Sequence, residues 1–192
     1  VDKGVKAYLL TINEDVDVKN MSKGQRKYIK IGEDNGENKG YKCRIRKRWY
    51  SVPSIWIPDA FLLRRSNVYP KFVLNGIDAV STDTMHRIKI KDEYDNRKIL
   101  LSYYNSISFA FTELCGRSYG GGVLEILPKE AENIIIPNID DMDEQNVNRL
   151  IGILDDNIRH NKDIREAIKV MDKEILENYL GISADTISMY RE

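Results

Sequence analysis

The sequence predicts an α+β protein: a curved, mostly antiparallel sheet around one buried apolar helix, followed by a C-terminal helical appendage. Several short segments before residue 91 alternate between apolar and polar residues and are separated by turn signals, as antiparallel strands are. The segment 97–115 has apolar residues at helical spacing along most of its length. After Pro137 the chain is acidic and has two amphipathic helical stripes.

Strands are expected where alternating or short apolar segments end in turn residues. The clearest alternation starts at Tyr41, and Cys43 and Ile45 follow on the same side, with basic residues between them. This pattern predicts a half-buried strand with a basic outer face. Asn75-Gly76 is a strong turn signal between two further strands. The predicted strands are 6–12, 41–50, 61–63, 72–74, 85–90 and 123–127.

Helices are expected at 21–31 and 97–115, near Glu130, and twice in the acidic tail. Ser22 is the expected N-cap of the first helix, and Gly116 is the expected end of the second, buried one. Polar, glycine-rich loops are expected at 32–40 and 120–122. The tail helices are predicted from two apolar stripes, formed by Val147, Leu150, Ile151, Leu154 and Ile158 and by Ile164, Ile168, Met171 and Ile175.

Charge is segregated along a chain whose formal net charge is zero. Residues 39–91 contain twelve Lys or Arg against three Asp, or about +9, whereas residues 128–192 contain eight against fifteen Asp or Glu, or about −7. A basic block in a neutral protein indicates a polyanion-binding surface, although a solvated face gives the same pattern. The change at Pro137 predicts a main domain at 1–137 and an acidic helical appendage at 138–192.

Several functions are disfavoured by the sequence. The longest nearly apolar stretch is too short to span a bilayer, and there is no signal-peptide pattern, so no membrane partner is expected. Cys43 and Cys115 are isolated and the chain has two histidines, so we expect buried free thiols and no metal site. The chain begins at Val1 and is interpreted as a fragment or a processed product.

No catalytic residue is assigned. The five prolines are never adjacent, which excludes the Asn/Asp-Pro-Pro-aromatic loop that amino-methyltransferases need. Pro58-Asp59 could begin a nuclease motif, but no later acidic residue stands two places before a lysine. No cofactor is expected in this chain.

An ordered set of motifs resembles one protein family. They include Tyr41-Lys42-Cys43-Arg44-Ile45-Arg46, Trp49-Tyr50-Ser51-Val52-Pro53-Ser54 and Pro58-Asp59-Ala60-Phe61-Leu62. The most telling is Glu113-Leu114-Cys115-Gly116-Arg117-Ser118-Tyr119-Gly120-Gly121-Gly122. Over roughly residues 5–137, the chain resembles the C-terminal target-recognition domain of adenine-specific DNA methyltransferases of restriction–modification systems.

The resemblance implies that residues 1–137 recognise a sequence in double-stranded DNA and position the target adenine for an N-terminal catalytic domain, which would be the chain's other partner. S-adenosylmethionine would bind to that catalytic domain, whose residues have no counterpart here. The resemblance also implies a cytoplasmic location in a bacterium or archaeon.

Candidate DNA contacts are basic, polar and glycine residues of the predicted strands and turns. Cations neutralise phosphates, arginine can bind guanine through two hydrogen bonds, and polar side chains on turns suit base edges. The glycine loop could present main-chain N–H groups to a phosphate, although a sharp turn under the sheet is favoured. The candidates are Arg44, Arg46, Lys47, Arg48, Arg64, Arg65, Asn75, Thr82, Thr84, His86, Arg117 and Gly121.

Structural roles stay open for some of these residues and their neighbours. A core position is favoured for Trp49 and Trp56, and a structural hydrogen bond is favoured for His86. Two other functions also stay open. The chain could be half of a specificity subunit of a multi-subunit restriction–modification complex, or a protein-interaction module whose acidic helices at 146–154 and 164–176 dock a partner.

Overall fold

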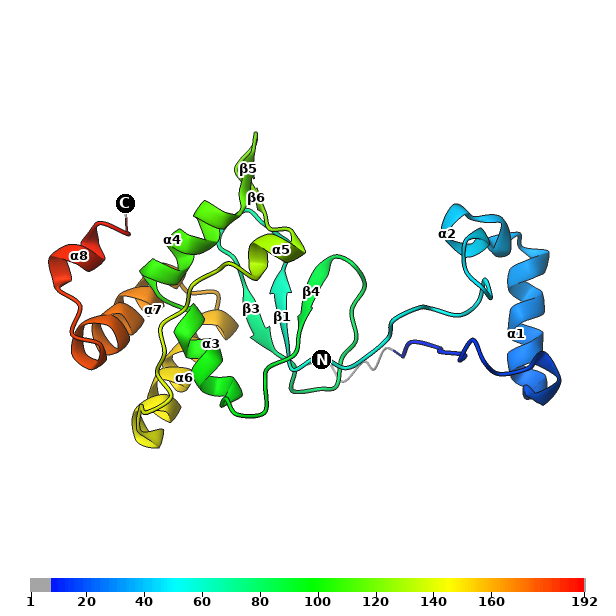
Figure 1. The fold of residues 1–192 in the computed structure, drawn as a ribbon, viewed down its shortest axis with the longest axis horizontal. Coiled ribbons are helices and arrows are strands. Elements are labelled where there is room, and N and C mark those ends of the chain that lie inside the picture. Colours follow the sequence, from blue (N-terminus) through cyan, green and yellow to red (C-terminus); the bar gives the residue numbers. More distant parts are fainter. Residues whose placement is uncertain (1–7, 192) are drawn as a thin grey trace. The chain divides into compact units, whose positions relative to one another are not determined.

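The computed structural model describes residues 8–191, which form two compact units divided between Trp56 and Ile57 (Figure 1). Each unit has a hydrophobic core of its own. The predicted strand at 6–12 begins outside the described residues, and residues 8–12 adopt no regular structure, so this part of the prediction is wrong. Ile12 is nevertheless buried, because its side chain packs into the core of the first unit.

The first unit is organised around the helix α1 (Lys23–Asp34). The Ser22 hydroxyl accepts a hydrogen bond from the Gln25 N–H and the Gln25 side chain accepts one from the Ser22 N–H, which confirms the predicted N-cap. The core consists of Ile12, Met21 and Ile29, with Val16, Trp49 and Tyr50 packed against it. The remaining helical turns are η1 (Val18–Asn20), η2 (Glu37–Lys39) and α2 (Tyr41–Arg44).

Trp49 contributes to this core. A Cβ added to Gly32 of α1 would overlap the end of the Trp49 ring, so the helix and the indole are in close contact. The indole N–H donates to Glu33 Oε1 at 3.4 Å. Trp49 therefore packs against the core, as favoured, but it is half-buried rather than buried.

The predicted strand at 41–50 is wrong, because Tyr41–Arg44 forms the helical turn α2 and the chain then continues in bends. Tyr41 and Ile45 were expected to face the core but are 71% and 67% exposed. The described part of this unit contains no strand that could pair with the segment. Alternation does not specify a strand here, because a strand needs a partner for its backbone groups.

The described part of the second unit contains two three-stranded antiparallel sheets. The first has the strand order β3-β1-β4 and is formed by β1 (Ala60–Leu63), β3 (Phe72–Leu74) and β4 (Met85–Ile88). The second has the order β2-β6-β5 and is formed by β2 (Arg65–Ser66), β6 (Val123–Glu125) and β5 (Arg117–Tyr119). The α+β class is confirmed, and the single expected sheet is divided because the chain changes pairing partners at Arg64.

The single buried helix predicted at 97–115 is instead two helices, α3 (Asn96–Tyr103) and α4 (Ser106–Cys115). Asn105 separates them, because its backbone is extended and its side chain accepts a hydrogen bond from the Ser108 N–H at 2.9 Å. An N-cap side chain therefore starts a new helix where apolar spacing predicted a continuous one.

The acidic tail is helical, as predicted, and follows the short helix α5 (Pro128–Ala131). Its apolar stripes are buried in one core with the first sheet and α3, so they are already covered within the unit. Docking of a partner on these apolar stripes would require the unit to open. Docking on the exposed acidic faces of the helices stays a prediction. The functional boundary at residue 137 stays a prediction. The tail elements are α6 (Glu144–Arg159), α7 (Ile164–Met171), η3 (Asp172–Tyr179) and α8 (Ala184–Ser188).

One buried carboxylate joins the tail to α4. Asp172 is 0% exposed and accepts hydrogen bonds from the Ser106 N–H at 2.8 Å and the Ser106 hydroxyl at 2.5 Å. Its second oxygen also accepts from Arg191 Nε at 2.8 Å. Because Ser106 is the first residue of α4, the carboxylate lies at the positive end of that helix.

Cys43 and Cys115 are free thiols, as expected, but they are half-buried rather than buried. No helix within residues 8–191 is long and apolar enough to cross a membrane. In the same part of the chain, no three His, Cys, Asp or Glu side chains are grouped so that they could hold a metal ion.

Candidate nucleic-acid interface

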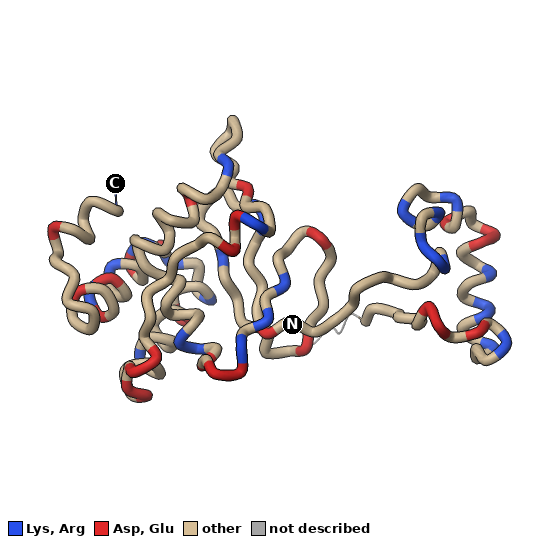
Figure 2. The backbone as a smooth tube through the Cα atoms, in the orientation of Figure 1, with Lys and Arg blue, Asp and Glu red and all other residues tan. Residues whose placement is uncertain are grey.

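The basic segment of the first unit comprises residues 41–50, and Figure 2 shows Lys and Arg residues both in this segment and along α1. Arg44 is exposed. Lys47 is also exposed, and its Nζ lies 3.4 Å from a carboxylate oxygen of Asp15 in a solvated ion pair. Such pairs contribute little to stability, so Lys47 can exchange Asp15 for a phosphate at small cost.

Arg46 and Arg48 have a different part in the basic segment, because both stabilise its bends. Arg46 Nη1 donates to the Trp49 carbonyl oxygen at 3.4 Å, and Arg48 Nη1 donates to the Tyr50 hydroxyl oxygen at 2.9 Å. The hydrogen bond to Tyr50 raises the pKa of the Arg48 guanidinium. Arg44 and Lys47 are therefore the two candidates of this segment that can reach a phosphate without giving up a structural bond.

The glycine loop of the second unit is the tip of a hairpin formed by β5 and β6, which projects from the unit in Figure 1. Residues 117–122 are all exposed. Gly121 and Gly122 have φ of 92° and 75°, which lie in the left-handed region that side chains disfavour. The sharp turn that was favoured is present, but it lies in solvent rather than under a sheet.

Alanine at Gly121 or Gly122 is expected to weaken the hairpin, because each would strain the backbone by about 1–2 kcal/mol. Hydrogen-exchange protection of the β5 and β6 amides should fall roughly tenfold per 1.4 kcal/mol. Gly120→Ala is the matched control, since Gly120 has no positive φ and a Cβ there meets no atom within 4 Å. Equal protection in all three variants would contradict the expectation.

Two arginines of the second sheet, and Arg64 just before β2, lie near the base of this hairpin. Glu125 of β6 is opposite Arg65 of β2 and opposite Arg117 of β5, so their side chains lie on one face of the sheet. Arg64 Nε and Arg65 Nε each donate to Glu125 Oε1 at 3.0 Å. Arg117 Nε donates to Glu130 Oε1 at 2.7 Å. The predicted candidates Arg64, Arg65 and Arg117 are thus brought together.

The two carboxylates are ionised by their surroundings. Burial raises the pKa of Glu125, but hydrogen bonds and charges from Arg65 and Arg64 outweigh it and leave the pKa below its usual value. The Leu127 N–H, which donates to Glu130 at 2.7 Å, is the main cause of the lowered pKa of Glu130, and Arg117 adds to it.

The polar candidates have contacts within the protein. Asn75 Nδ2 donates to the carbonyl oxygens of Pro58 and Ala79 at 2.8 and 3.0 Å, and its Oδ1 accepts from the Ala79 N–H at 2.9 Å. Reading a base would therefore require Asn75 to give up bonds that hold its turn. Thr82 and Thr84 are exposed, with their hydroxyl oxygens 3.4 Å apart.

His86 of β4 makes the structural hydrogen bond that was favoured for it. Its Nε2 lies 2.7 Å from the Ile126 carbonyl oxygen, and only a protonated Nε2 can donate there. The bond links the first sheet to the residue that follows β6. His86 therefore supports the base of the hairpin, and its contact with DNA stays a prediction.

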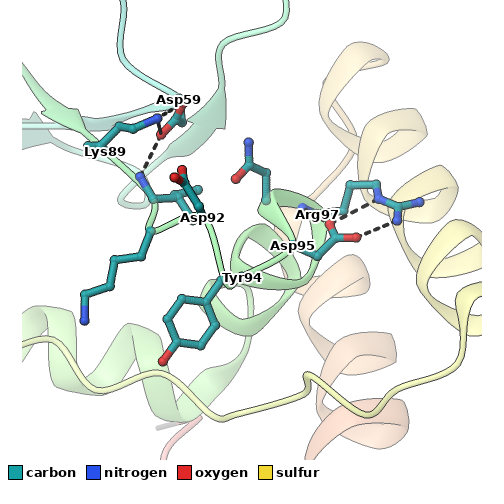
Figure 3. A pocket seen from close by; sticks show the side chains of 9 residues that line it. Asp59, Lys89, Asp92, Tyr94, Asp95 and Arg97 are labelled. Carbon is teal, nitrogen blue, oxygen red and sulfur yellow. Dashed lines mark hydrogen bonds and ion pairs between the residues drawn. The ribbon is translucent and has the colours of Figure 1, made fainter.

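A pocket of about 430 Å³ lies beside the end of β4 and the start of α3 (Figure 3). Two of its carboxylates are paired with cations that also line it. Asp59 accepts from the Ile90 N–H at 2.8 Å and pairs with Lys89 at 3.0 Å, and Asp95 pairs with Arg97 at 2.6 Å. The Ile90 N–H, followed by Lys89, lowers the pKa of Asp59. Small-molecule sites are mostly apolar with a few unpaired polar groups, and this pocket does not match that description.

Sequence reasoning missed Glu125 and Glu130, which hold the arginines of the hairpin base. A signal for Glu125 existed, because it stands inside an otherwise apolar strand, where a charge needs a cationic partner. Its partners Arg64 and Arg65 could not be identified in this way, because they lie 60 residues or more away in the sequence.

The fold and the exposed groups define a small α+β domain with two separate arginine-rich surfaces. Over residues 1–176 the chain matches the family described as Type II methyltransferase M.Eco57I, C-terminal domain, and it belongs to that family. The predicted resemblance to the C-terminal domains of restriction–modification methyltransferases is thereby confirmed. The match continues past Pro137 through α6 and α7. No curated protein and no solved structure matches the chain.

Proposed function

We propose that this chain recognises a specific sequence in double-stranded DNA as the C-terminal domain of an adenine-N6 DNA methyltransferase of a restriction–modification system. It would position the target adenine for a catalytic domain outside this chain. One observation carries the proposal: a domain of a methyltransferase family has an exposed, glycine-tipped hairpin with Arg64, Arg65 and Arg117 at its base.

The two arginine-rich surfaces are suited to different parts of DNA recognition. Arg44 ends α2 and Lys47 lies in the bend that follows, and both are exposed cations, which suits contact with phosphates. A two-stranded β-ribbon fits into the major groove, where base edges can be told apart. We therefore assign phosphate binding to the basic segment and sequence reading to the hairpin.

Methyl transfer is assigned to the methyltransferase of which this chain would be the C-terminal domain. S-adenosylmethionine would supply the methyl group there, bound to the catalytic domain. The pocket beside β4 and α3 does not suit it, because most of the residues that line the pocket are charged, whereas an adenine ring needs apolar contacts. No step of the reaction is therefore derived through this chain, and a cytoplasmic location beside the chromosome is proposed with the function.

DNA binding by the chain tests this function. The probe is a mixed-sequence duplex of about 25 base pairs, measured by fluorescence anisotropy at 50 and 200 mM salt. If about four phosphates are contacted, affinity should fall roughly 100-fold between the two salt concentrations. An affinity that does not change between the two salt concentrations, or no binding at 50 mM salt, would count against the function.

A further inference from the structure

Glu125 has an unusual environment for a charged residue on a strand. It is only 5% exposed, and its Oε1 accepts hydrogen bonds from Arg64 Nε and Arg65 Nε, each at 3.0 Å. Arg65 Nη2 lies 2.9 Å from the same oxygen as an ion pair. The ladder between β2 and β6 fixes the backbones as well, because the Ile126 N–H donates to the Arg64 carbonyl oxygen at 2.9 Å. One buried carboxylate therefore orients two guanidinium groups.

Stability alone gives little reason for this arrangement. Moving a carboxylate out of water costs about as much free energy as its ion pairs recover. Well-packed apolar residues often stabilise a fold as well or better. What a buried carboxylate does supply is a fixed direction for its partners, because arginine otherwise has many rotamers. The pairing thus points to a need for oriented guanidinium groups.

The bonds to Glu125 leave part of each guanidinium available. Within the described residues, Arg64 uses only Nε, so its two terminal nitrogens make no hydrogen bond, and Arg65 uses Nε and Nη2 and keeps Nη1. Their side chains are 35% and 68% exposed. Two adjacent N–H donors in one plane match the O6 and N7 acceptors of guanine in the major groove.

We propose that Glu125 is a positioning residue of the DNA interface, which fixes Arg64 and Arg65 so that their remaining N–H groups read guanine. The inference rests on the DNA-recognition function proposed above. Beyond that function, the inference names Glu125 as the residue that makes the reading specific and guanine as the base that is read. It also gives a reason for a carboxylate beside groups that must approach a polyanion. Glu125 lowers the net positive charge of the surface, but it fixes the orientation of both guanidinium groups.

The test compares the chain with its Glu125→Gln variant on a pool of duplexes that contain ten randomised base pairs. Bound duplexes are recovered over several rounds and sequenced, and affinity for the unselected pool is measured separately. The wild-type chain should enrich guanine at one or two positions. Glu125→Gln keeps the shape but offers a weaker acceptor, so it should lose guanine at those positions and keep its other preferences.

Affinity for the unselected pool should move in the opposite direction. Glu125→Gln removes a negative charge from the interface, so its binding to unselected duplexes should stay equal or become severalfold tighter. A variant that is merely less stable would bind every duplex less well. Glu93→Gln is the matched control, because it removes the same charge from an exposed carboxylate that pairs weakly with Lys91 at 3.9 Å.

A second variant tests the proposal without relying on correct folding of the Glu125→Gln variant. Arg64→Lys with Arg65→Lys keeps both charges but loses the planar forks, so it should lose the same guanine positions. Unchanged guanine enrichment in these variants, or wild-type enrichment without guanine, would overturn the proposal while DNA binding stands. If the wild-type chain does not bind the pool at 50 mM salt, the proposed function itself fails.

Discussion

Asp172→Ala should lower the free energy of unfolding of this chain by about 3 kcal/mol. The substitution leaves the Ser106 N–H and hydroxyl without their acceptor, and each unsatisfied buried donor costs roughly 1–3 kcal/mol. It also releases Arg191 from its 2.8 Å bond and removes a negative group from the start of α4. Urea unfolding followed by circular dichroism measures the change.

Glu177→Ala is the control for this prediction, because Glu177 lies in the same helix, η3, and is exposed. Its effect should stay within about 0.5 kcal/mol, as for most surface substitutions. A loss below 1 kcal/mol for Asp172→Ala would mean that water replaces the carboxylate and that the tail is not held to α4 by this network. Asp172→Asn should also destabilise the chain, since an amide nitrogen would face the Arg191 N–H.

Reversing the charge of Arg44 and Lys47 to glutamate should weaken DNA binding by roughly 100-fold at 50 mM salt, if each neutralises one phosphate. The slope of the logarithm of affinity against the logarithm of salt concentration should become less steep by about two. Both residues are exposed and neither stabilises a bend, so the fold of the first unit should be retained. Adding Arg46→Glu and Arg48→Glu would remove two bonds of the segment and confuse binding with stability.

The matched control reverses two charges elsewhere. Arg165→Glu with Lys173→Glu changes exposed residues of α7 and η3 by the same total charge. If binding depends on the net charge of the chain, both double variants will weaken it equally. If binding depends on the basic segment, only the first will. An unchanged affinity in the Arg44 and Lys47 variant would remove the basic segment from the proposed interface.

Local signals in the sequence were sufficient for several elements. Ser22 with Gln25 predicted the start of α1, because a capping box needs only neighbouring residues. The apolar stripes of the tail predicted α6 and α7, since helical hydrogen bonds form within one segment. Arg64 and Arg65 were selected as candidates by their type and by their place at a predicted strand end. Arg117 was selected for its place between the predicted buried helix and the glycine loop.

Local signals failed where the outcome depends on a distant partner or on a competing cap. The alternation around Cys43 did not produce a strand, because no partner strand lies within the described part of its unit. The capping side chain of Asn105 divided a helix that apolar spacing presented as continuous.

By itself, the sequence determined the α+β class, the family and the identity of the basic candidates, because these follow from composition and from ordered short motifs. Only the tertiary structure decided which candidates act together. Strand pairing between β2, β6 and β5 brings Arg65, Glu125 and Arg117 into one row, although they are far apart in the chain. The tertiary structure also distinguished Arg44 and Lys47, which are available to a ligand, from Arg46 and Arg48, which stabilise the backbone. The physical reason is that hydrogen bonds and burial depend on distances in space, which a sequence specifies only through the complete fold.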